Sequence, residues 1–195
     1  MSALFIDVDS QRDFLYPAGA LYVAGAESIV PAIARLNRHA AQHGITVIST
    51  TDAHTENDPE FRTWPKHCVA GTLGQRKAEA TLLDSRVVIP NRDCDLAIEG
   101  ARQIILEKQT VDVFQSRAFL PIVQRLDPDR FVVYGVVTEV CVLYAVRGLL
   151  QLGKPVMVVA DAVKELTAQG CQSAMDEMRA AGVIPATAAQ LIARL

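Results

Sequence analysis

Short apolar runs alternate along this chain with segments of helical periodicity, and this alternation restricts the possible fold more than any other feature. Most runs are continuously apolar and rich in Val and Ile, as strands covered on both faces must be. The expected strands cover residues 3–9, 45–50, 102–108, 130–137, 154–161 and 183–187. The expected helices cover residues 27–43, 117–126, 139–152, 165–181 and 188–194. The pattern predicts an α/β fold with three αβα layers, a parallel sheet of roughly six strands, and a single domain over residues 1–195.

Composition excludes several classes of protein. The net charge is −3 and the basic residues are scattered, so we expect no nucleic-acid partner. The longest apolar runs are of strand length, well below the roughly 18 residues of a membrane span, so we expect no membrane partner. The N-terminus lacks a basic segment, and the four cysteines include no CxxC pair. We therefore expect a cytoplasmic protein with free thiols.

Reactive side chains follow four of the expected strands. In open parallel sheets, ligands bind outside the carboxyl ends of the strands, where these side chains would meet. The four strands end at Asp9, at Asp52 with His54, at Lys108, and just before Cys141. This convergence predicts a binding or catalytic site at one edge of the sheet.

Cys141 stands where a strand passes into a helix. It can be a small residue packed against the sheet, or a nucleophile whose pKa is lowered by the first helical turn, near amides suited to an oxyanion. A cysteine nucleophile needs a proton acceptor, and Asp9 is the candidate because burial would raise its pKa. Lys108 would supply positive charge beside both groups. As plain structural residues, Asp9 would sit in a turn and Lys108 would be solvated at a strand end.

The segment 52–101 interrupts the alternation and is too long for a plain connection, so we interpret it as a functional excursion. Its first part, about residues 52–75, contains two acids and two histidines that together suit Zn²⁺, Mn²⁺ or Fe²⁺. These candidate ligands are Asp52, His54, Glu60 and His67. Solvated loop residues are the alternative. We interpret Cys68 as buried rather than as a ligand.

Together these motifs resemble the isochorismatase-like cysteine hydrolases, and among them most the nicotinamidases, over essentially the whole chain. "DSQRDFLYPAGALYVAG" is similar to the family opening D-x-Q-x-D-F, and "WPKHCVAGT" resembles the metal loop. "LEKQTVDVF" resembles the segment with the family lysine, and "GVVTEVCV" resembles G-x-x-T-x-x-C-V. Two positions depart from the family pattern. Many nicotinamidases have histidine at the position of Glu60, and some have histidine at the position of Val140.

The resemblance implies roles for particular residues. The implied catalytic residues are Asp9, Lys108 and Cys141, with the amides of Val137 and Cys141 as the oxyanion hole. The implied ligands of one divalent metal, with Zn²⁺ expected and Mn²⁺ or Fe²⁺ as alternatives, are Asp52, His54, Glu60 and His67. Phe14 and Trp64 would enclose a pyridine ring, although as core residues they would need no functional explanation. A cis peptide bond is implied between Val136 and Val137.

The implied activity is hydrolysis of a small carboxamide through a thioester, with nicotinamide converted to nicotinate and ammonia in NAD salvage (pyridine nucleotide biosynthesis) by a homo-oligomer. Cys141 argues against the true isochorismatases, which lack this cysteine. Two alternatives stay open. One is hydrolysis of another small amide, such as a carbamoyl or ureido compound. The other is a non-catalytic oligomeric binding protein of the same fold.

Overall fold

A parallel sheet of seven strands runs through the protein, whose computed structural model describes residues 2–193. The strands are β1 (Ala3–Val8), β2 (Thr46–Asp52), β3 (Arg86–Ile89), β4 (Gln103–Lys108), β5 (Arg130–Val136), β6 (Val156–Lys164) and β7 (Ile184–Ala186). Their order across the sheet is β3-β4-β2-β1-β5-β6-β7, and every neighbouring pair is parallel. The predicted α/β class and the parallel sheet are confirmed.

The predicted number of six strands was wrong by one edge strand, β3. Its four residues, "RVVI", lie inside the segment that we interpreted as irregular. β3 pairs only with β4, and Val88 is 52% exposed. A short edge strand has one partner and a partly solvated face, so it lacks the continuous apolar run that identifies the central strands.

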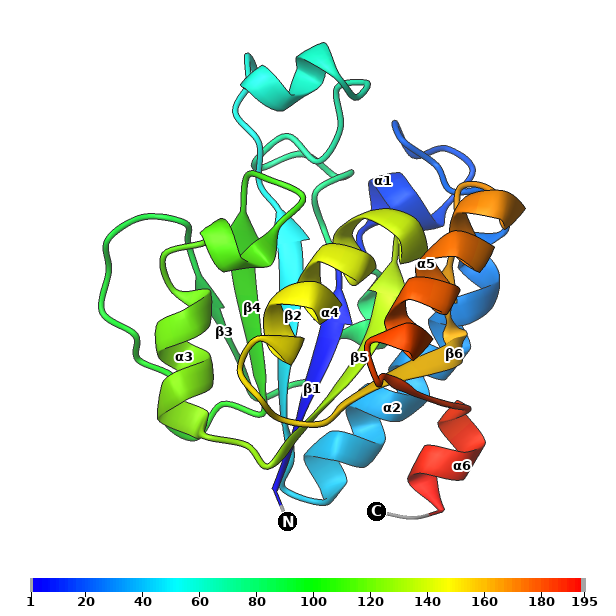
Figure 1. Cartoon of the computed structure of the whole chain (residues 1–195). Coiled ribbons are helices and arrows are strands. Elements are labelled where there is room, and N and C mark those ends of the chain that lie inside the picture. Colours follow the sequence, from blue (N-terminus) through cyan, green and yellow to red (C-terminus); the bar gives the residue numbers. More distant parts are fainter. Residues whose placement is uncertain (1, 194–195) are drawn as a thin grey trace.

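Helices cover both faces of the sheet (Figure 1). One face carries α2 (Val30–Gln42) and α6 (Ala188–Ile192), and the other carries α3 (Phe119–Leu126), α4 (Leu143–Leu150) and α5 (Ala168–Ala180). The shorter helical turns are α1 (Arg12–Leu15), η1 (Ala26–Ile29), η2 (Pro59–Arg62), η3 (Glu79–Thr81), η4 (Val113–Gln115) and η5 (Thr138–Val142). The helix expected over residues 27–43 has one apolar face, formed by Ile29, Ile33, Leu36 and Ala40, and this face is buried against the core. The end of the helix expected over 188–194 lies outside the described residues.

A crevice is expected where the chain changes direction across the sheet. β1 lies between β2 and β5, so the strands that follow β1 extend first to one side and later to the other. Ligands bind at such a switch point, beyond the carboxyl ends of the strands. Gly135 has a φ of 117°, and a Cβ there would lie 2.0 Å from the Val8 carbonyl oxygen. Only glycine therefore lets β5 run this close to β1.

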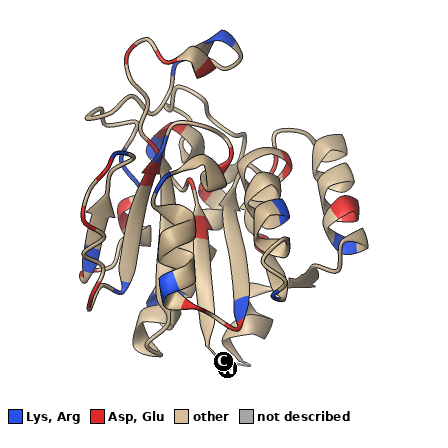
Figure 2. Cartoon of the chain, turned by 60° about the vertical axis from the view of Figure 1, so that its left-hand side comes forward, with Lys and Arg blue, Asp and Glu red and all other residues tan. Residues whose placement is uncertain are grey.

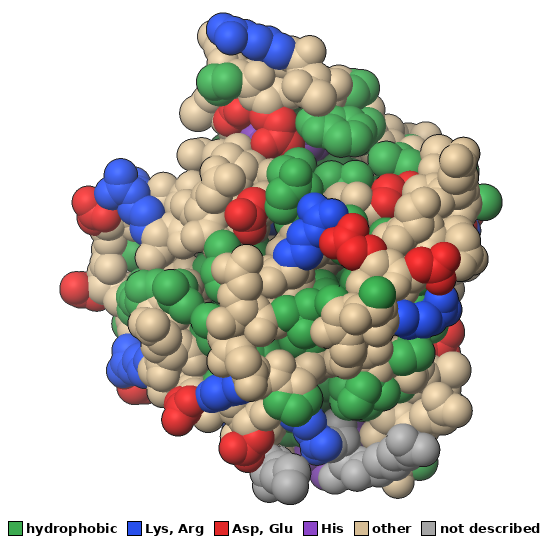
Figure 3. Space-filling model, in the orientation of Figure 1, with side chains coloured by type: hydrophobic (Ala, Val, Ile, Leu, Met, Phe, Trp, Pro, Cys, Tyr) green, Lys and Arg blue, Asp and Glu red, His purple; other side chains and the backbone are tan. Residues whose placement is uncertain are grey.

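The segment after β2 rises beyond the carboxyl ends of the strands, above this switch point (Figure 1). Basic positions are scattered over the elements rather than gathered on one of them (Figure 2). On the face seen in Figure 3, Lys and Arg side chains lie singly or beside acids. No helix within residues 2–193 combines the length and apolar composition needed to cross a membrane.

Candidate active site

Three of the predicted site residues meet beyond the carboxyl ends of β1, β4 and β5. The Lys108 ammonium nitrogen lies 2.8 Å from Asp9 Oδ2 and 3.9 Å from the Cys141 sulfur. All three side chains are buried: Asp9 is 0%, Lys108 1% and Cys141 7% exposed. Lys108 is therefore not a solvated strand-end lysine. Its charge contacts two carboxylates, those of Asp9 and Asp52, and lies beside the thiol.

Asp9 is held in an unusual backbone conformation directly after β1. Its φ is 47°, in the left-handed region, which costs an L-residue about 1–2 kcal/mol. The Asp9 amide donates to the Thr50 carbonyl at 3.2 Å, and the Thr50 hydroxyl donates to Asp9 Oδ1 at 2.6 Å. Two bonds to β2 thus fix this turn and leave the other carboxylate oxygen directed at Lys108.

The electrostatics of Cys141 differ from our expectation. We expected the first helical turn to lower the pKa of the thiol, but burial raises it well above its usual value. Lys108 lowers the pKa of the thiol, whereas the carboxylates of Asp9 and Asp52 raise it further. Desolvation outweighs the helix terminus because the thiolate would be enclosed beside two carboxylates. The resting group is therefore a neutral thiol that needs a base.

Asp9 and Lys108 have the protonation properties that this arrangement requires. Burial raises the pKa of Asp9, while Lys108 and the Thr50 hydroxyl lower it. Burial alone would lower the pKa of Lys108, but the carboxylates of Asp52 and Asp9 raise it well above its usual value. Lys108 thus remains an ammonium ion, beside a carboxyl group that gains a proton more readily than an ordinary aspartate.

Cys141 lies in the π-helical turn η5, which follows β5. The peptide bond between Val136 and Val137 is cis, as the family resemblance implied. The Val137 carbonyl accepts hydrogen bonds from the Val140 and Val142 amides, both at 3.1 Å. These bonds fix the turn that presents Val137 and Cys141 at the crevice. The single helix expected over 139–152 is therefore two elements, η5 and α4.

Three of the four expected metal ligands form a buried cluster. The ligand atoms of Asp52, His54 and His67 all lie within 4.8 Å of one another. Nε2 of His54 and Nε2 of His67 lie 3.9 Å and 3.8 Å from the same oxygen, Asp52 Oδ2. His54 Nε2 is buried and has no hydrogen-bond partner among the described residues. Two imidazoles and a carboxylate around an unpartnered nitrogen fit a divalent transition metal.

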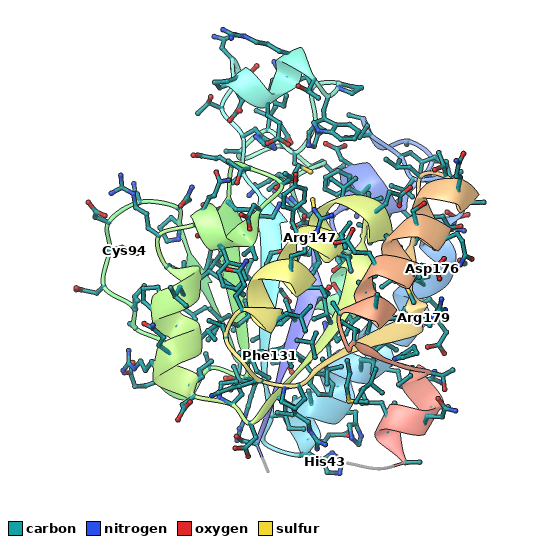
Figure 4. The ribbon with its side chains drawn as sticks, in the orientation of Figure 1. His43, Cys94, Phe131, Arg147, Asp176 and Arg179 are labelled. Atoms are coloured by element: carbon teal, nitrogen blue, oxygen red, sulfur yellow. The ribbon has the colours of Figure 1, made fainter. Side chains whose placement is uncertain are left out.

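Glu60, the fourth expected ligand, is not part of this cluster, but its side chain lines the same pocket. Burial and the nearby Asp52 carboxylate raise the pKa of Glu60. Of the other two histidines, His39 lies in the last turn of α2 and His43 caps the end of that helix, and their ring centroids are 4.1 Å apart. His43 lies at the opposite end of the sheet (Figure 4).

Sequence reasoning missed the residues that lie beside the two histidine ligands. Asp58 Oδ2 lies 3.1 Å from Nδ1 of His54, and the Pro65 carbonyl oxygen lies 2.6 Å from Nδ1 of His67. Nε2 of each ring faces Asp52. For His67 the contact between Nδ1 and Pro65 fixes this orientation, as in metal-binding histidines, whereas Asp58 is close to His54 Nδ1 without hydrogen-bond geometry. The partner of His67 is a backbone carbonyl, that of Pro65, and a backbone carbonyl cannot be identified from the sequence. Asp58 was visible only as another loop acid.

Two further residues of the motif D-x-Q-x-D-F, Gln11 and Asp13, also bond to groups near the site. The buried Gln11 side chain bonds the main chain of Asp52. The Asp13 carboxylate accepts from the amides of Cys68, at 2.7 Å, and Ala20, at 3.0 Å. The turn after β1 thus bonds to the main chain of Asp52, in the metal cluster, and of Cys68, which directly follows His67. Cys68 is fully buried, as expected.

A cavity that opens to solvent lies between Cys141 and the metal cluster, and the space inside it, open solvent included, is about 330 Å³. Its polar lining consists of Asp52, Glu60, His67 and Cys141. Its apolar lining consists of Phe14, Leu21, Trp64, Val111, Val137, Val140 and Leu166. The two aromatic residues expected around a ring, Phe14 and Trp64, therefore line the same cavity as Cys141. The largely apolar lining with a few polar groups suits contact with a small molecule that has an apolar face.

The fold and this site define the class of the protein as a three-layer αβα protein with a buried Asp–Lys–Cys cluster at the carboxyl ends of its central strands. The family model described as isochorismatase domain matches residues 2–190. The chain therefore belongs to the isochorismatase domain family, which confirms the resemblance drawn from its motifs.

Comparison with known proteins identifies relatives at low identity. A nicotinamidase of Acinetobacter baylyi is 27% identical, with 91% of this chain and 89% of the relative aligned. A nicotinamidase/pyrazinamidase of Mycobacterium tuberculosis is 26% identical over 94% of this chain and 97% of its own. The solved structure of a Pyrococcus horikoshii pyrazinamidase in complex with zinc is 27% identical, with a TM-score of 0.80 over 96% of this chain and 99% of that one.

Proposed function

We propose that this protein is a metal-containing cysteine amidohydrolase that converts nicotinamide and water into nicotinate and ammonia. The observation on which this rests is the contact of Lys108 with both Asp9 and Cys141, together with the position of Cys141 in the lining of a mostly apolar cavity. The names of the relatives, nicotinamidases and pyrazinamidases, support an amide of an aromatic ring as the substrate.

Acylation begins with transfer of the Cys141 proton to Asp9. Because burial raises the pKa of the thiol, the thiolate forms only as the base removes the proton. The sulfur then attacks the carboxamide carbon, and the amide nitrogen leaves as ammonia with a proton from Asp9. The products of this half-reaction are a thioester on Cys141 and an ionised Asp9.

Deacylation reverses these roles. Asp9 removes a proton from water, which attacks the thioester carbon, and the Cys141 sulfur leaves and recovers the proton. The carboxylate product departs. In both halves the developing oxyanion would accept hydrogen bonds from the amides of Val137 and Cys141, which lie in a turn fixed by backbone bonds. Lys108 offsets the charges of Asp9 and of the transient thiolate.

The metal would be held by Asp52, His54 and His67, with Glu60 at the edge of the same cavity. When bound, it would supply a Lewis-acidic site for a ring nitrogen of the substrate, with Zn²⁺ the metal that the Pyrococcus horikoshii relative supports. Phe14 and Trp64 would hold the ring faces, and the Pro65 carbonyl keeps His67 oriented. The chemical steps belong to Asp9 and Cys141.

The composition of the cavity favours nicotinamide over a carbamoyl amino acid. A carbamoyl amino acid has a carboxylate, which needs a cationic partner when it is buried. The lining of this cavity includes no Arg or Lys among the described residues, and it includes the acids Asp52 and Glu60. Ureido compounds without a carboxylate remain the second candidate. The intact Asp9, Lys108 and Cys141 set disfavours a non-catalytic binding protein. The proposed setting is NAD salvage in the cytoplasm, by a homo-oligomer.

Ammonia release from a panel of amides, with metal content measured on the same preparation, tests this function. Nicotinamide should be hydrolysed with the highest kcat/KM, and the Cys141→Ala variant should release no ammonia above background. A higher kcat/KM for ureido compounds without a carboxylate or for aliphatic amides would replace nicotinamide as the substrate. No turnover of any amide by the metal-loaded protein would favour a binding protein.

A further inference from the structure

One carboxylate joins the turn that contains Cys141 to the start of α5. Oε1 of Glu139, in η5, accepts hydrogen bonds from the backbone amides of Leu166 at 3.1 Å and Thr167 at 2.9 Å. Thr167 in turn caps α5, because its hydroxyl oxygen accepts from the Gly170 amide at 3.0 Å. The loop before α5 is thus fastened to the nucleophile's own turn by two bonds to a charged acceptor.

The fastened loop supplies a wall of the substrate cavity. Leu166 lines the cavity although its side chain is 40% exposed. Val140, the residue after Glu139, lines the same cavity. An exposed leucine on a surface loop has little apolar burial to hold it in place. Its position over the cavity therefore depends on the backbone bonds at Leu166 and Thr167.

Close packing around Glu139 means that a side chain at Gly170 would displace the Glu139 carboxylate. A Cβ at Gly170 would lie 2.7 Å from Glu139 Oε1 and 2.8 Å from the Thr167 hydroxyl oxygen. An alanine in a helix is ordinarily more favourable than glycine. At this position it would press on the carboxylate that fastens the loop, so the absence of a side chain here is part of the same arrangement.

We propose that Glu139 is a positioning residue that holds Leu166 as a wall of the substrate cavity, and so limits the size of the acyl group that can reach Cys141. Glu139 contacts neither the reacting atoms nor the proposed metal ligands. The inference rests on the proposed function only in taking an amide as the substrate. The position of the wall itself can be measured without turnover.

Steady-state kinetics on the amide that the wild type hydrolyses best form the first test. Glu139→Ala removes the acceptor, so KM should rise by about tenfold, the scale of one hydrogen bond to a charged group, with kcat changed by less than about threefold. Gly170→Ala and Leu166→Ala should likewise raise KM and leave kcat nearly unchanged. Glu139→Gln keeps an oxygen that can accept from both amides, so it should stay within about threefold of wild type in both constants.

Matched controls separate this effect from general damage to α5. Glu177→Ala also removes a carboxylate that joins α4 to α5, since Glu177 binds Arg147 at 2.6 and 2.7 Å, but that pair is 46% exposed and does not line the cavity. Ser173→Ala raises helix propensity at an exposed position of α5. Both variants should have the wild-type KM.

Alkylation of Cys141 provides a readout independent of turnover. The rate with iodoacetamide is compared with the rate of a bulky N-aryl maleimide, and the modified residue is identified by peptide mass spectrometry. The ratio of the alkylation rate with the bulky reagent to the rate with the small reagent should rise at least about fivefold in Glu139→Ala, Gly170→Ala and Leu166→Ala. The same ratio of rates should stay at the wild-type value in Glu139→Gln and in both controls.

The outcomes distinguish this inference from the proposed function. If the wild type hydrolyses no amide, the proposed function fails, and the alkylation ratio still decides whether Glu139 holds the wall. An unchanged ratio in Leu166→Ala, which removes the wall directly, would overturn the inference even if Glu139→Ala failed to fold. A Glu139→Gln variant as impaired as Glu139→Ala would show that charge, rather than the two accepted bonds, is what matters.

Discussion

Gln11 binds Asp52 through both groups of the Asp52 peptide backbone. The Asp52 amide donates to Gln11 Oε1 at 2.7 Å, and Gln11 Nε2 donates to the Asp52 carbonyl at 2.8 Å. Gln11 Nε2 also donates to the Gln75 carbonyl at 2.7 Å. Asp52 contacts Lys108 and lies in the metal cluster. The turn that contains Asp9 is therefore coupled to the proposed metal site through one buried amide.

Replacing Gln11 should weaken both stability and metal binding. Gln11→Ala removes the partner of the buried Asp52 backbone groups and of the half-buried Gln75 carbonyl, at a cost of about 1–3 kcal/mol for each buried unpaired group. Thermal unfolding and bound metal per chain should both decrease. Gln109→Ala, which removes a 3.2 Å bond to the Ala53 carbonyl and a 3.5 Å bond from the Asn91 amide, is the matched control and should have the smaller effect. Equal effects of the two variants would contradict the coupling.

Removing the thiol should abolish turnover while the fold is retained. Cys141→Ala replaces a buried sulfur with a smaller side chain in a helical turn, and alanine is a good helix former. The circular dichroism spectrum should match that of the wild type, with no detectable thioester. Cys94, which is exposed in a loop distant from the crevice (Figure 4), is the control, and Cys94→Ser should be fully active. Retained turnover in Cys141→Ala would move the nucleophile elsewhere.

Asp9→Asn tests the assignment of the base. The amide keeps the shape of the side chain but cannot take the Cys141 proton, so kcat should fall by about 10²–10⁴-fold. Substrate binding, measured by calorimetry, should persist, and no acyl-enzyme should accumulate after rapid mixing because acylation itself is blocked. Asp13→Asn is the comparison, because that carboxylate accepts from backbone amides and does not contact Cys141. A rate for Asp9→Asn near that of the wild type would exclude Asp9 as the base.

The acid limb of the pH profile should report Asp9. Burial raises the pKa of Asp9, and catalysis needs its ionised form, so kcat/KM should fall as pH decreases through a value above the usual aspartate pKa of about 4. The raised pKa of Lys108 predicts no loss of its charge below about pH 10. Metal content measured at each pH separates titration from metal loss. An acid limb at or below about pH 4 with metal retained would contradict this assignment.

Removing one imidazole should reduce metal binding before it affects the thiol. His54→Ala or His67→Ala leaves fewer ligands in the cluster, so bound metal should decrease by about 10-fold or more at limiting supply. KM for nicotinamide should rise, while alkylation of Cys141 continues. His43→Ala, at the other end of the sheet, should bind metal as the wild type does. Full activity on nicotinamide by a preparation without metal would exclude the proposed role of the metal.

Much of the fold could be predicted because its central strands are covered on both faces. Burial on both faces requires continuous apolar runs, and such runs are visible at β1, β4 and β5 without any neighbour. The carboxyl ends of parallel strands meet at one edge, so Asp9, Lys108 and Cys141 could be brought together from their order alone. β3 was not predicted, because a four-residue edge strand need not be apolar on both faces.

The local sequence determined which residues could act, and the tertiary structure decided in what state they would act. A cysteine in the first turn of a helix predicted a lowered pKa, yet enclosure beside two carboxylates raises it. Desolvation depends on everything packed around a group, and no local pattern contains that information. For the same reason, the roles of Gln11 and Glu139 appeared only in the structure. Each bonds to backbone groups distant in the chain, at Asp52 and at Leu166, and a backbone amide looks the same in every sequence.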